Sequence, residues 1–144
     1  WDFDVLDEDE KSYQFPGIEL KDFYCYDLPV IAPSEGYIIE IFDGIEDNKI
    51  NEVNLKENWG NTIIIKHGEH FYTKLSHIKK GSFKVKKGDY VTKGQVIGSC
   101  GSSGRSPEPH LHFQLQTTPY VDSKTIEFPL AYYLQKENNK YHFH

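Results

Sequence analysis

The chain has 144 residues, of which 38% are hydrophobic and 15% aromatic, and its formal net charge at pH 7 is −6. This length suits one domain of about 100–150 residues, and so apolar and aromatic a composition excludes an intrinsically disordered chain. The acidic balance argues against a nucleic-acid partner, which needs a concentrated basic face, and no apolar run approaches the roughly 20 residues of a membrane span.

The two ends of the chain are polar. Six of the first ten residues are acidic, and so dense a cluster of like charges predicts a solvated arm over residues 1–12. Residues 136–144 are expected to form a polar, frayed tail, which leaves one domain over residues 13–135. Because the chain begins at Trp1 rather than Met, we expect it to be part of a longer precursor, with any leader or anchor outside it.

Short β-branched and aromatic runs separated by glycine turns dominate the region between these ends. The predicted strands cover residues 37–42, 61–66, 70–75, 90–91, 95–99 and 110–116. A hairpin turn is predicted at 67–69, a long polar loop at 43–58, and a short helical turn at 129–134. Short strands at this regular spacing predict an all-β, single-domain antiparallel sandwich or partly open barrel.

Two histidines follow a loop rich in glycine, serine and proline, Gly101–Pro109. His110 and His112 alternate with Leu111 and Phe113 along the predicted strand. Both imidazoles therefore face one way, about 7 Å apart, and the apolar pair faces the core. This arrangement suits a zinc centre in which one imidazole ligates the metal and its neighbour moves the proton of the bound water. The spacing alone equally allows two surface histidines on an ordinary strand.

Four ordered motifs connect this segment with a known family. They are Pro-Val-Ile-Ala-Pro-Ser-Glu-Gly at 29–36, Tyr-Thr-Lys-Leu-Ser-His-Ile at 72–78, the glycine-turn segment 85–98, and the run 101–113 that ends in Pro-His-Leu-His-Phe. Over residues 29–116 the chain resembles the lysostaphin-type zinc endopeptidases, whose catalytic module is the LytM domain. The resemblance implies a LytM-like fold with an open groove.

The resemblance also implies roles for three histidines. His112 falls where the family has a zinc-ligating histidine, and His110 where it has the proton acceptor from the attacking water. His77 matches the histidine that orients this water and stabilises the oxyanion. Enzymes of this family cut peptide cross-bridges of bacterial cell walls outside the cytoplasmic membrane, with zinc activating the water.

The sequence departs from the family at the other two zinc ligands, which come from an early H-x-x-x-D segment. The best match, Phe-Pro-Gly-Ile-Glu at 15–19, puts Phe15 at the histidine and Glu19 at the aspartate. Phenylalanine has no lone pair, so His112 and Glu19 fall short of the three protein ligands of a catalytic zinc site. We therefore expect no tightly bound cofactor, and Phe15 to fill the vacated metal pocket. Phe15→His with Glu19→Asp is expected to recreate the ligand set.

Two residues are candidates to restore zinc binding, each with a simpler alternative. Cys25 is a good soft ligand when ionised, although a small buried side chain in an aromatic run is the commoner role. Glu108 replaces the glycine that usually stands two residues before the first histidine of Pro-His-Leu-His. It is either a misplaced ligand or a solvated loop charge.

Three functional hypotheses follow. The first is a catalytically inactive LytM-type domain outside the cytoplasmic membrane, in the periplasm or at the cell surface, that binds a peptidoglycan peptide or a protein partner such as a cell-wall hydrolase. The second is an active zinc metalloendopeptidase that cleaves peptidoglycan peptide cross-links. It would bind zinc through a non-standard ligand set, for instance Glu19, His112 and a rescuing residue. The third, a biotinyl or lipoyl carrier hairpin at 85–98, is disfavoured because the chain has no methionine and the tip is Asp89-Tyr90.

Overall fold

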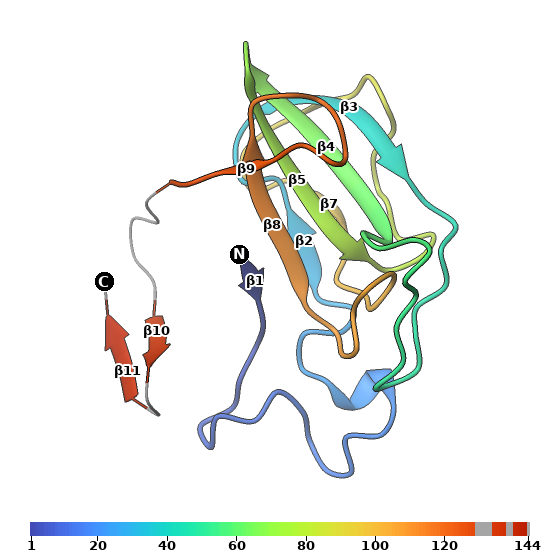
Figure 1. Ribbon diagram of the computed structural model, residues 1–144, viewed down its shortest axis with the longest axis vertical. Coiled ribbons are helices and arrows are strands. Elements are labelled where there is room, and N and C mark those ends of the chain that lie inside the picture. The colour runs from blue at the N-terminus through green and yellow to red at the C-terminus, as the bar shows by residue number, and fades with distance from the viewer. Residues whose placement is uncertain (129–133, 138–139, 144) are drawn as a thin grey trace.

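A computed structural model of the protein describes residues 1–128, 134–137 and 140–143. Its largest unit is a seven-stranded antiparallel sheet with the order β1-β8-β5-β4-β3-β6, to which β9 adds on β8 (Figure 1). These strands are β1 (Asp2–Phe3), β3 (Gly36–Phe42), β4 (Asn61–Gly68), β5 (Phe71–Ile78), β6 (Tyr90–Val91), β8 (Leu111–Gln116) and β9 (Thr125–Ile126). The remaining elements are the pair β2 (Pro29–Ile31) and β7 (Val96–Ser99), the hairpin β10 (Leu134–Glu137) and β11 (Lys140–Phe143), and the 3-10 turn η1 (Leu20–Asp22).

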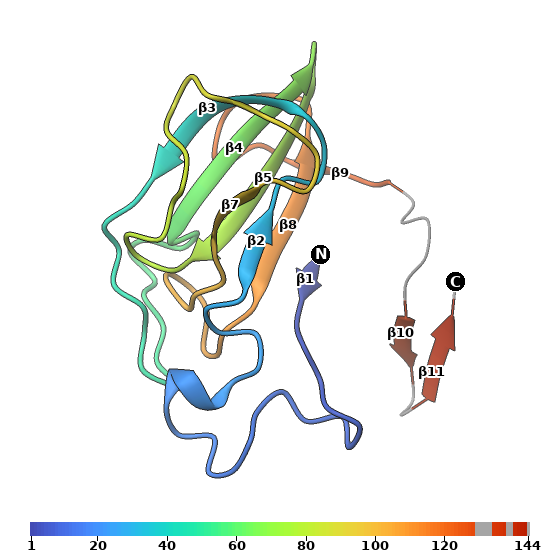
Figure 2. The same cartoon turned by 180° about the vertical axis from the view of Figure 1, so that it is seen from behind.

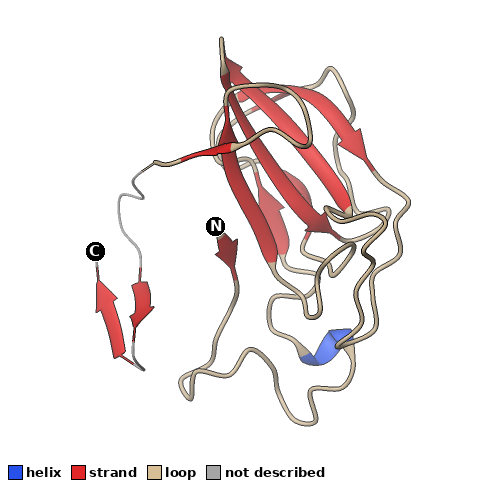
Figure 3. Ribbon diagram, viewed as in Figure 1, coloured by secondary structure: helices blue, strands red, loops and turns tan. Residues whose placement is uncertain are grey.

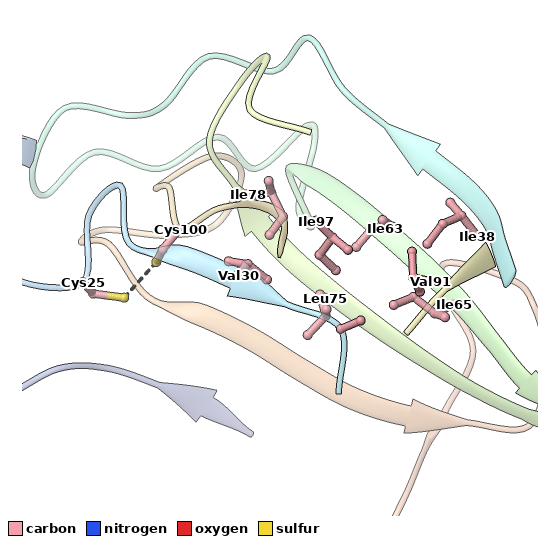
Figure 4. Packing of buried hydrophobic residues seen from close by; sticks show 11 residues of the cluster. Cys25, Val30, Ile38, Ile63, Ile65, Leu75, Ile78, Val91, Ile97 and Cys100 are labelled. Carbon is pink, nitrogen blue, oxygen red and sulfur yellow. Dashed lines mark hydrogen bonds between the residues drawn. The ribbon is translucent and has the colours of Figure 1, made fainter. Parts of the chain in front are cut away.

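The core lies between the main sheet and the smaller β2–β7 sheet. Figures 1 and 2 show these two sheets from opposite sides. Alternate residues of β4, Ile63 and Ile65, point into this space and are fully buried. They belong to one buried cluster with Val30 from β2 and Ile97 from β7 (Figure 4). The arrangement is a sandwich of unequal layers, which a strand period of two residues generates when one face of each strand is apolar.

The opposite face of the main sheet is polar and is covered by the chain itself. Register places Ile64, Lys74 and Gln114 side by side across β4, β5 and β8. Residues 117–124, between β8 and β9, fold back over this row, and Figure 1 shows the connection crossing in front of β4 and β5. Lys74 Nζ donates to Val121 O (2.7 Å), and Gln114 Nε2 donates to Ser123 O (3.0 Å).

The predicted all-β class is confirmed, since η1 is the one helical element among the described residues (Figure 3). The strands predicted at 37–42, 61–66, 90–91, 95–99 and 110–116 are present within a residue or two, and the strand predicted at 70–75 continues to Ile78. The loop over 43–58 forms no strand beyond an isolated bridge at Asp47. No helix in the described part of the chain is long and apolar enough to cross a membrane.

Both ends of the chain contain strands that local pattern did not predict. Within the arm 1–12, β1 pairs with β8 at the edge of the main sheet, although its two side chains remain exposed. At the other end, β10 begins at Leu134 and reaches into the segment 136–144, where it pairs with β11 as a hairpin. Of the helical turn predicted at 129–134, residues 129–133 lie outside the described residues, and Leu134 begins β10.

Candidate functional site

The three histidines singled out from the sequence lie together. His77 is the penultimate residue of β5, His110 immediately precedes β8, and His112 is the second residue of β8. The ring centroids of His77 and His110 are 4.6 Å apart, and those of His77 and His112 are 6.0 Å apart. The pairing of β5 with β8, which sets Ser76 opposite His112, produces this proximity.

His77 is buried and uncharged at neutral pH. Its Nδ1 donates to Ser103 O at 2.7 Å, and a neutral ring that donates through Nδ1 carries its lone pair on Nε2. Burial, together with the nearby His110, lowers the pKa of His77 to about 4. The residue also has a positive φ of 64°, an unusual backbone conformation for a non-glycine residue. Hydrogen bonds from its N–H to Trp59 O and from Gly101 N–H to its own carbonyl support this conformation.

His110 is held in the same tautomer. Its Nδ1 lies 3.1 Å from Glu108 O and 3.0 Å from Ser106 Oγ. The carbonyl can only accept, so Nδ1 carries a hydrogen, and a neutral ring in this arrangement has its lone pair on Nε2. Nε2 in turn lies 3.8 Å from Asp2 Oδ1.

His112 differs from the other two, because both of its ring nitrogens face oxygen acceptors. Nδ1 lies 2.8 Å from Asp2 Oδ1, and Nε2 lies 3.0 Å from Gln114 Oε1. The Gln114 amide is oriented by its own Nε2, which donates to Gln116 Oε1 and to Ser123 O. Both contacts of His112 are satisfied together only when both nitrogens donate, and a ring in that form offers no lone pair to a metal.

Asp2 is a site residue that sequence reasoning missed. It lies opposite His112 in the pairing of β1 with β8, 110 positions away in sequence. Burial acts to raise the pKa of Asp2, but the hydrogen bond with His112 and the charges of His110 and His112 outweigh it and lower the pKa. The carboxylate therefore stays ionised beside the histidines. In the sequence Asp2 is one of six acidic residues among the first ten, and nothing near it in the sequence indicates that its partner is His112.

The histidines line a hollow of about 260 Å³, which we call the histidine hollow. Its lining residues are Asp2, Asn58, Trp59, His77, Arg105, His110 and His112. The ring centroids of Trp59 and His112 are 5.0 Å apart. The ammonium nitrogen of Lys74 also lies over the Trp59 ring, 3.1 Å from its centroid. Trp59, Asn58 and Arg105 were also missed. For these three residues the sequence offered one signal, the aromatic side chain of Trp59 two positions before the predicted strand 61–66.

A tightly packed loop, residues 101–106, supports His77 and His110. Asn48 Nδ2 donates to the carbonyls of Ser102 (2.7 Å), Gly104 (2.7 Å) and Ser106 (3.1 Å). Gly104 has a φ of +78°, and a Cβ there would lie 2.4 Å from Gly60 N. The backbone approach therefore requires glycine at this position.

The structure does not bring the other sequence-predicted residues to the histidines. Glu19 is paired with Lys21 (2.5 Å) and lines a separate depression together with Tyr26 and Asp47. Phe15 is 95% exposed, so the prediction that it fills the metal pocket is wrong. It precedes η1 on a segment that packs through other side chains, such as Tyr13 against Phe23.

The structure also distinguishes between the alternatives for Cys25 and Glu108. Cys25 is buried within the core, as its simpler interpretation predicted. The Glu108 side chain is exposed, and its backbone carbonyl is the group that contacts His110. Neither side chain lines the histidine hollow.

These donors do not fit a catalytic zinc centre, which takes three protein ligands and an open position. Within the described ranges, no three His, Cys, Asp or Glu side chains are grouped to hold a metal ion. In addition, hydrogen bonds to Asp2 and Gln114 engage both ring nitrogens of His112.

An antiparallel sheet with three histidines at the joined ends of β5 and β8 defines a lysostaphin-type peptidase domain. The profile of Peptidase family M23 matches residues 17–125, and the chain belongs to this family. The glycyl-glycine endopeptidase ALE-1 of Staphylococcus capitis is 38% identical over 104 residues, covering 72% of this chain and 25% of the relative. The peptidoglycan DD-endopeptidase ShyC of Vibrio cholerae is 34% identical over 103 residues, covering 70% of this chain and 22% of the relative.

Among solved structures, lysostaphin from Staphylococcus simulans aligns with a TM-score of 0.51 and 30% identity, over 69% of this chain and 38% of that chain. The chain spans a quarter or less of the length of such curated relatives, from 13% to 25%. The alignment with the lysostaphin structure agrees with the all-β architecture described above.

Proposed function

We propose that this domain binds a peptidoglycan peptide, or an extended segment of a protein partner such as a cell-wall hydrolase, in the histidine hollow without cleaving it. The engagement of both His112 nitrogens by Asp2 and Gln114 carries this proposal. The position of Glu19 outside the hollow adds support, because it removes the second ligand that the family pattern requires. The domain would act outside the cytoplasmic membrane, where peptidoglycan lies.

The chemistry of the hollow suits binding. Trp59 offers an aromatic surface, Arg105 a guanidinium group, and His77 and His110 each an acceptor nitrogen on Nε2. A peptide with carboxylate and amide groups can meet the guanidinium group and the two acceptors. The names of the matched relatives, two endopeptidases of which one is a peptidoglycan enzyme, supply the class of ligand.

The test combines zinc content, hydrolysis and binding. We expect the purified chain to carry far less than one zinc ion, to release no soluble fragments from peptidoglycan sacculi, and to sediment with sacculi. Trp59→Ala should weaken this sedimentation several-fold, whereas Tyr120→Ala, at an exposed aromatic outside the hollow, should leave it unchanged. Hydrolysis that is lost in His110→Ala would refute the proposal.

An active peptidase with a non-standard ligand set is the second candidate. The observation in its favour is that the rings of His110 and His112 lie 4.6 and 6.0 Å from the ring of His77, and that the neutral rings of His77 and His110 carry their lone pairs on Nε2. This candidate predicts that the unmodified chain carries about one zinc ion and hydrolyses sacculi, and that Asp2→Ala, which releases His112 Nδ1, retains both properties. Our proposal predicts neither, because one imidazole released on β8 still leaves the hollow without a second and third ligand of the family type.

The restoring double substitution tests where the early family motif lies in the structure. Sequence alone predicts that Phe15→His with Glu19→Asp recreates the ligand set, but neither residue lines the hollow. We therefore expect the double variant to have the zinc affinity of the unmodified chain. A marked gain would show that the segment around η1 reaches His112 and that the placement inferred from the family pattern is right.

A further inference from the structure

Two cysteines that the histidine hollow does not use meet inside the core. Cys25 and Cys100 are 5% and 2% exposed, and their Sγ atoms are 2.8 Å apart (Figure 4). They are 75 positions apart in sequence, and both are free thiols in the structure. Contact between two buried sulfur atoms contributed by distant parts of the chain requires the backbone on both sides to hold them there.

The backbone does so through hydrogen bonds on both strands. Leu28 N–H donates to Cys25 O (3.2 Å), which closes a turn before β2, and Asp27 within that turn has a positive φ of 65°. Asp27 N–H then donates to Cys100 O (2.9 Å), and Cys100 N–H donates to Leu28 O (2.8 Å). Leu28 and Cys100 therefore extend the β2–β7 ladder by one step beyond Pro29 and Ser99.

We propose that Cys25 and Cys100 form an intramolecular disulfide. With oxidised glutathione as the oxidant, the Cys25 thiolate attacks the glutathione disulfide, forms a mixed disulfide and releases one glutathione thiolate. The Cys100 thiolate then attacks the Cys25 sulfur and releases the second. Two electrons pass from the cysteine pair to glutathione, and the two protons lost by the cysteine thiols are taken up by the two glutathione thiolates.

Burial determines when this bond forms. The hydrogen bond with Cys25, followed by burial, raises the pKa of the Cys100 thiol well above its usual value. The thiolate is the reacting species, so the folded dithiol reacts slowly and the pair oxidises while the chain folds. Once formed, the bond is shielded from reductants by the same core. Disulfides persist in oxidising compartments, so this inference uses the proposed location outside the cytoplasmic membrane but not the proposed ligand.

The bond has three structural consequences. It joins the turn that follows η1 to Cys100, which directly precedes the loop 101–106 that supports His77 and His110. Because the two cysteines are 75 positions apart in sequence, the bond also closes a long stretch of chain, and a cross-link of this kind restricts the unfolded chain most. It also withdraws Cys25 as a zinc ligand, because a disulfide sulfur is no longer a thiolate.

The test counts thiols. The full chain is refolded in a buffer of oxidised and reduced glutathione, denatured, treated with iodoacetamide and weighed by intact mass spectrometry. We expect no alkylation, a mass lower by two hydrogen atoms than that of the dithiol, and a cross-linked peptide that joins Cys25 to Cys100. Cys25→Ser and Cys100→Ser, the matched controls, should each show one thiol that reacts with iodoacetamide or carries glutathione.

A second measurement does not depend on how the serine variants fold. For the unmodified chain, dithiothreitol should lower the urea midpoint of unfolding, and reduction should need partial unfolding. Two alkylated thiols per refolded chain, a disulfide-linked dimer, or zinc that protects Cys25 from oxidation would each overturn the inference. Failure to bind sacculi with the bond intact would count against the proposed function alone.

Discussion

Lys74 provides a quantitative test of the covered face of the main sheet. It is fully buried, and its ammonium group donates to Val121 O and lies over the Trp59 ring. Burial lowers the pKa of Lys74 to about 8 from its ordinary 10.5, although the charge of Asp122 acts in the opposite direction. Between these two pH values the unfolded chain binds a proton that the folded chain does not, so stability rises with pH across that window.

The size of the effect follows from the two values. A difference of one pH unit corresponds to about 1.4 kcal/mol, so the interval from about 8 to 10.5 corresponds to about 3 kcal/mol. Lys74→Met removes this cost of burying the charge, and it also removes the hydrogen bond to Val121, about 1–3 kcal/mol, and the contact with Trp59, about 0.5–2 kcal/mol. These changes nearly cancel at pH 7, so the informative quantity is the slope.

We expect the free energy of unfolding of the unmodified chain to rise by about 3 kcal/mol relative to Lys74→Met as the pH passes from 8 to 10.5. Urea denaturation at several pH values measures it, and the difference between the two proteins removes the contribution of other titrating groups. Lys66→Met, at an exposed lysine of β4, is the control and should run parallel to the unmodified chain. If Lys74→Met also runs parallel, the lysine is not buried under the 117–124 connection.

Three further predictions concern the supports of the histidine hollow. Asn48→Ala should lower the free energy of unfolding by about 1–3 kcal/mol in urea, because three loop carbonyls lose their common donor; an unchanged midpoint would refute this. Gly104→Ala should cost at least about 2 kcal/mol more than Gly81→Ala, since both positions have positive φ but only Gly104 has backbone within the reach of a new Cβ; equal losses would contradict the close approach. Asp2→Asn should leave the chain folded and shift the NMR resonances of the His112 ring, because it replaces an ionised partner of Nδ1; unchanged resonances would show that the contact is absent in solution.

The strands of the main sheet could be predicted because their pattern is local. The run of Ile63, Ile64 and Ile65 indicates a strand whatever surrounds it, since β-branched side chains fit a pleated surface. The two-residue strand β1 carries no such pattern, and the charges around it indicate solvent. It forms because β8 leaves donors and acceptors available at its outer edge, a property of the assembled sheet.

The candidate site likewise has residues that the sequence could predict and residues that it could not. His77, His110 and His112 could be brought together from sequence because each stands in a recognisable motif of the family. The position of Glu19 could not be predicted, because it depends on how the segment before β2 packs, and that segment is held by contacts such as the bond between Cys100 N–H and Leu28 O. A spacing pattern gives the order of ligands along a chain, but their distances in space come from tertiary packing.

The outer edge of β8 bears on how the protein avoids association with its own copies. β1 pairs with Leu111 and His112, Trp1 exchanges hydrogen bonds with Phe113, and β9 pairs with the last two residues of the strand. An unpaired strand edge is a template for edge-to-edge aggregation, and here two short segments from opposite ends of the sequence block it. A chain that lost residues 1–3 would expose the backbone of β8 beside the histidines, and its first failure would be self-association rather than unfolding.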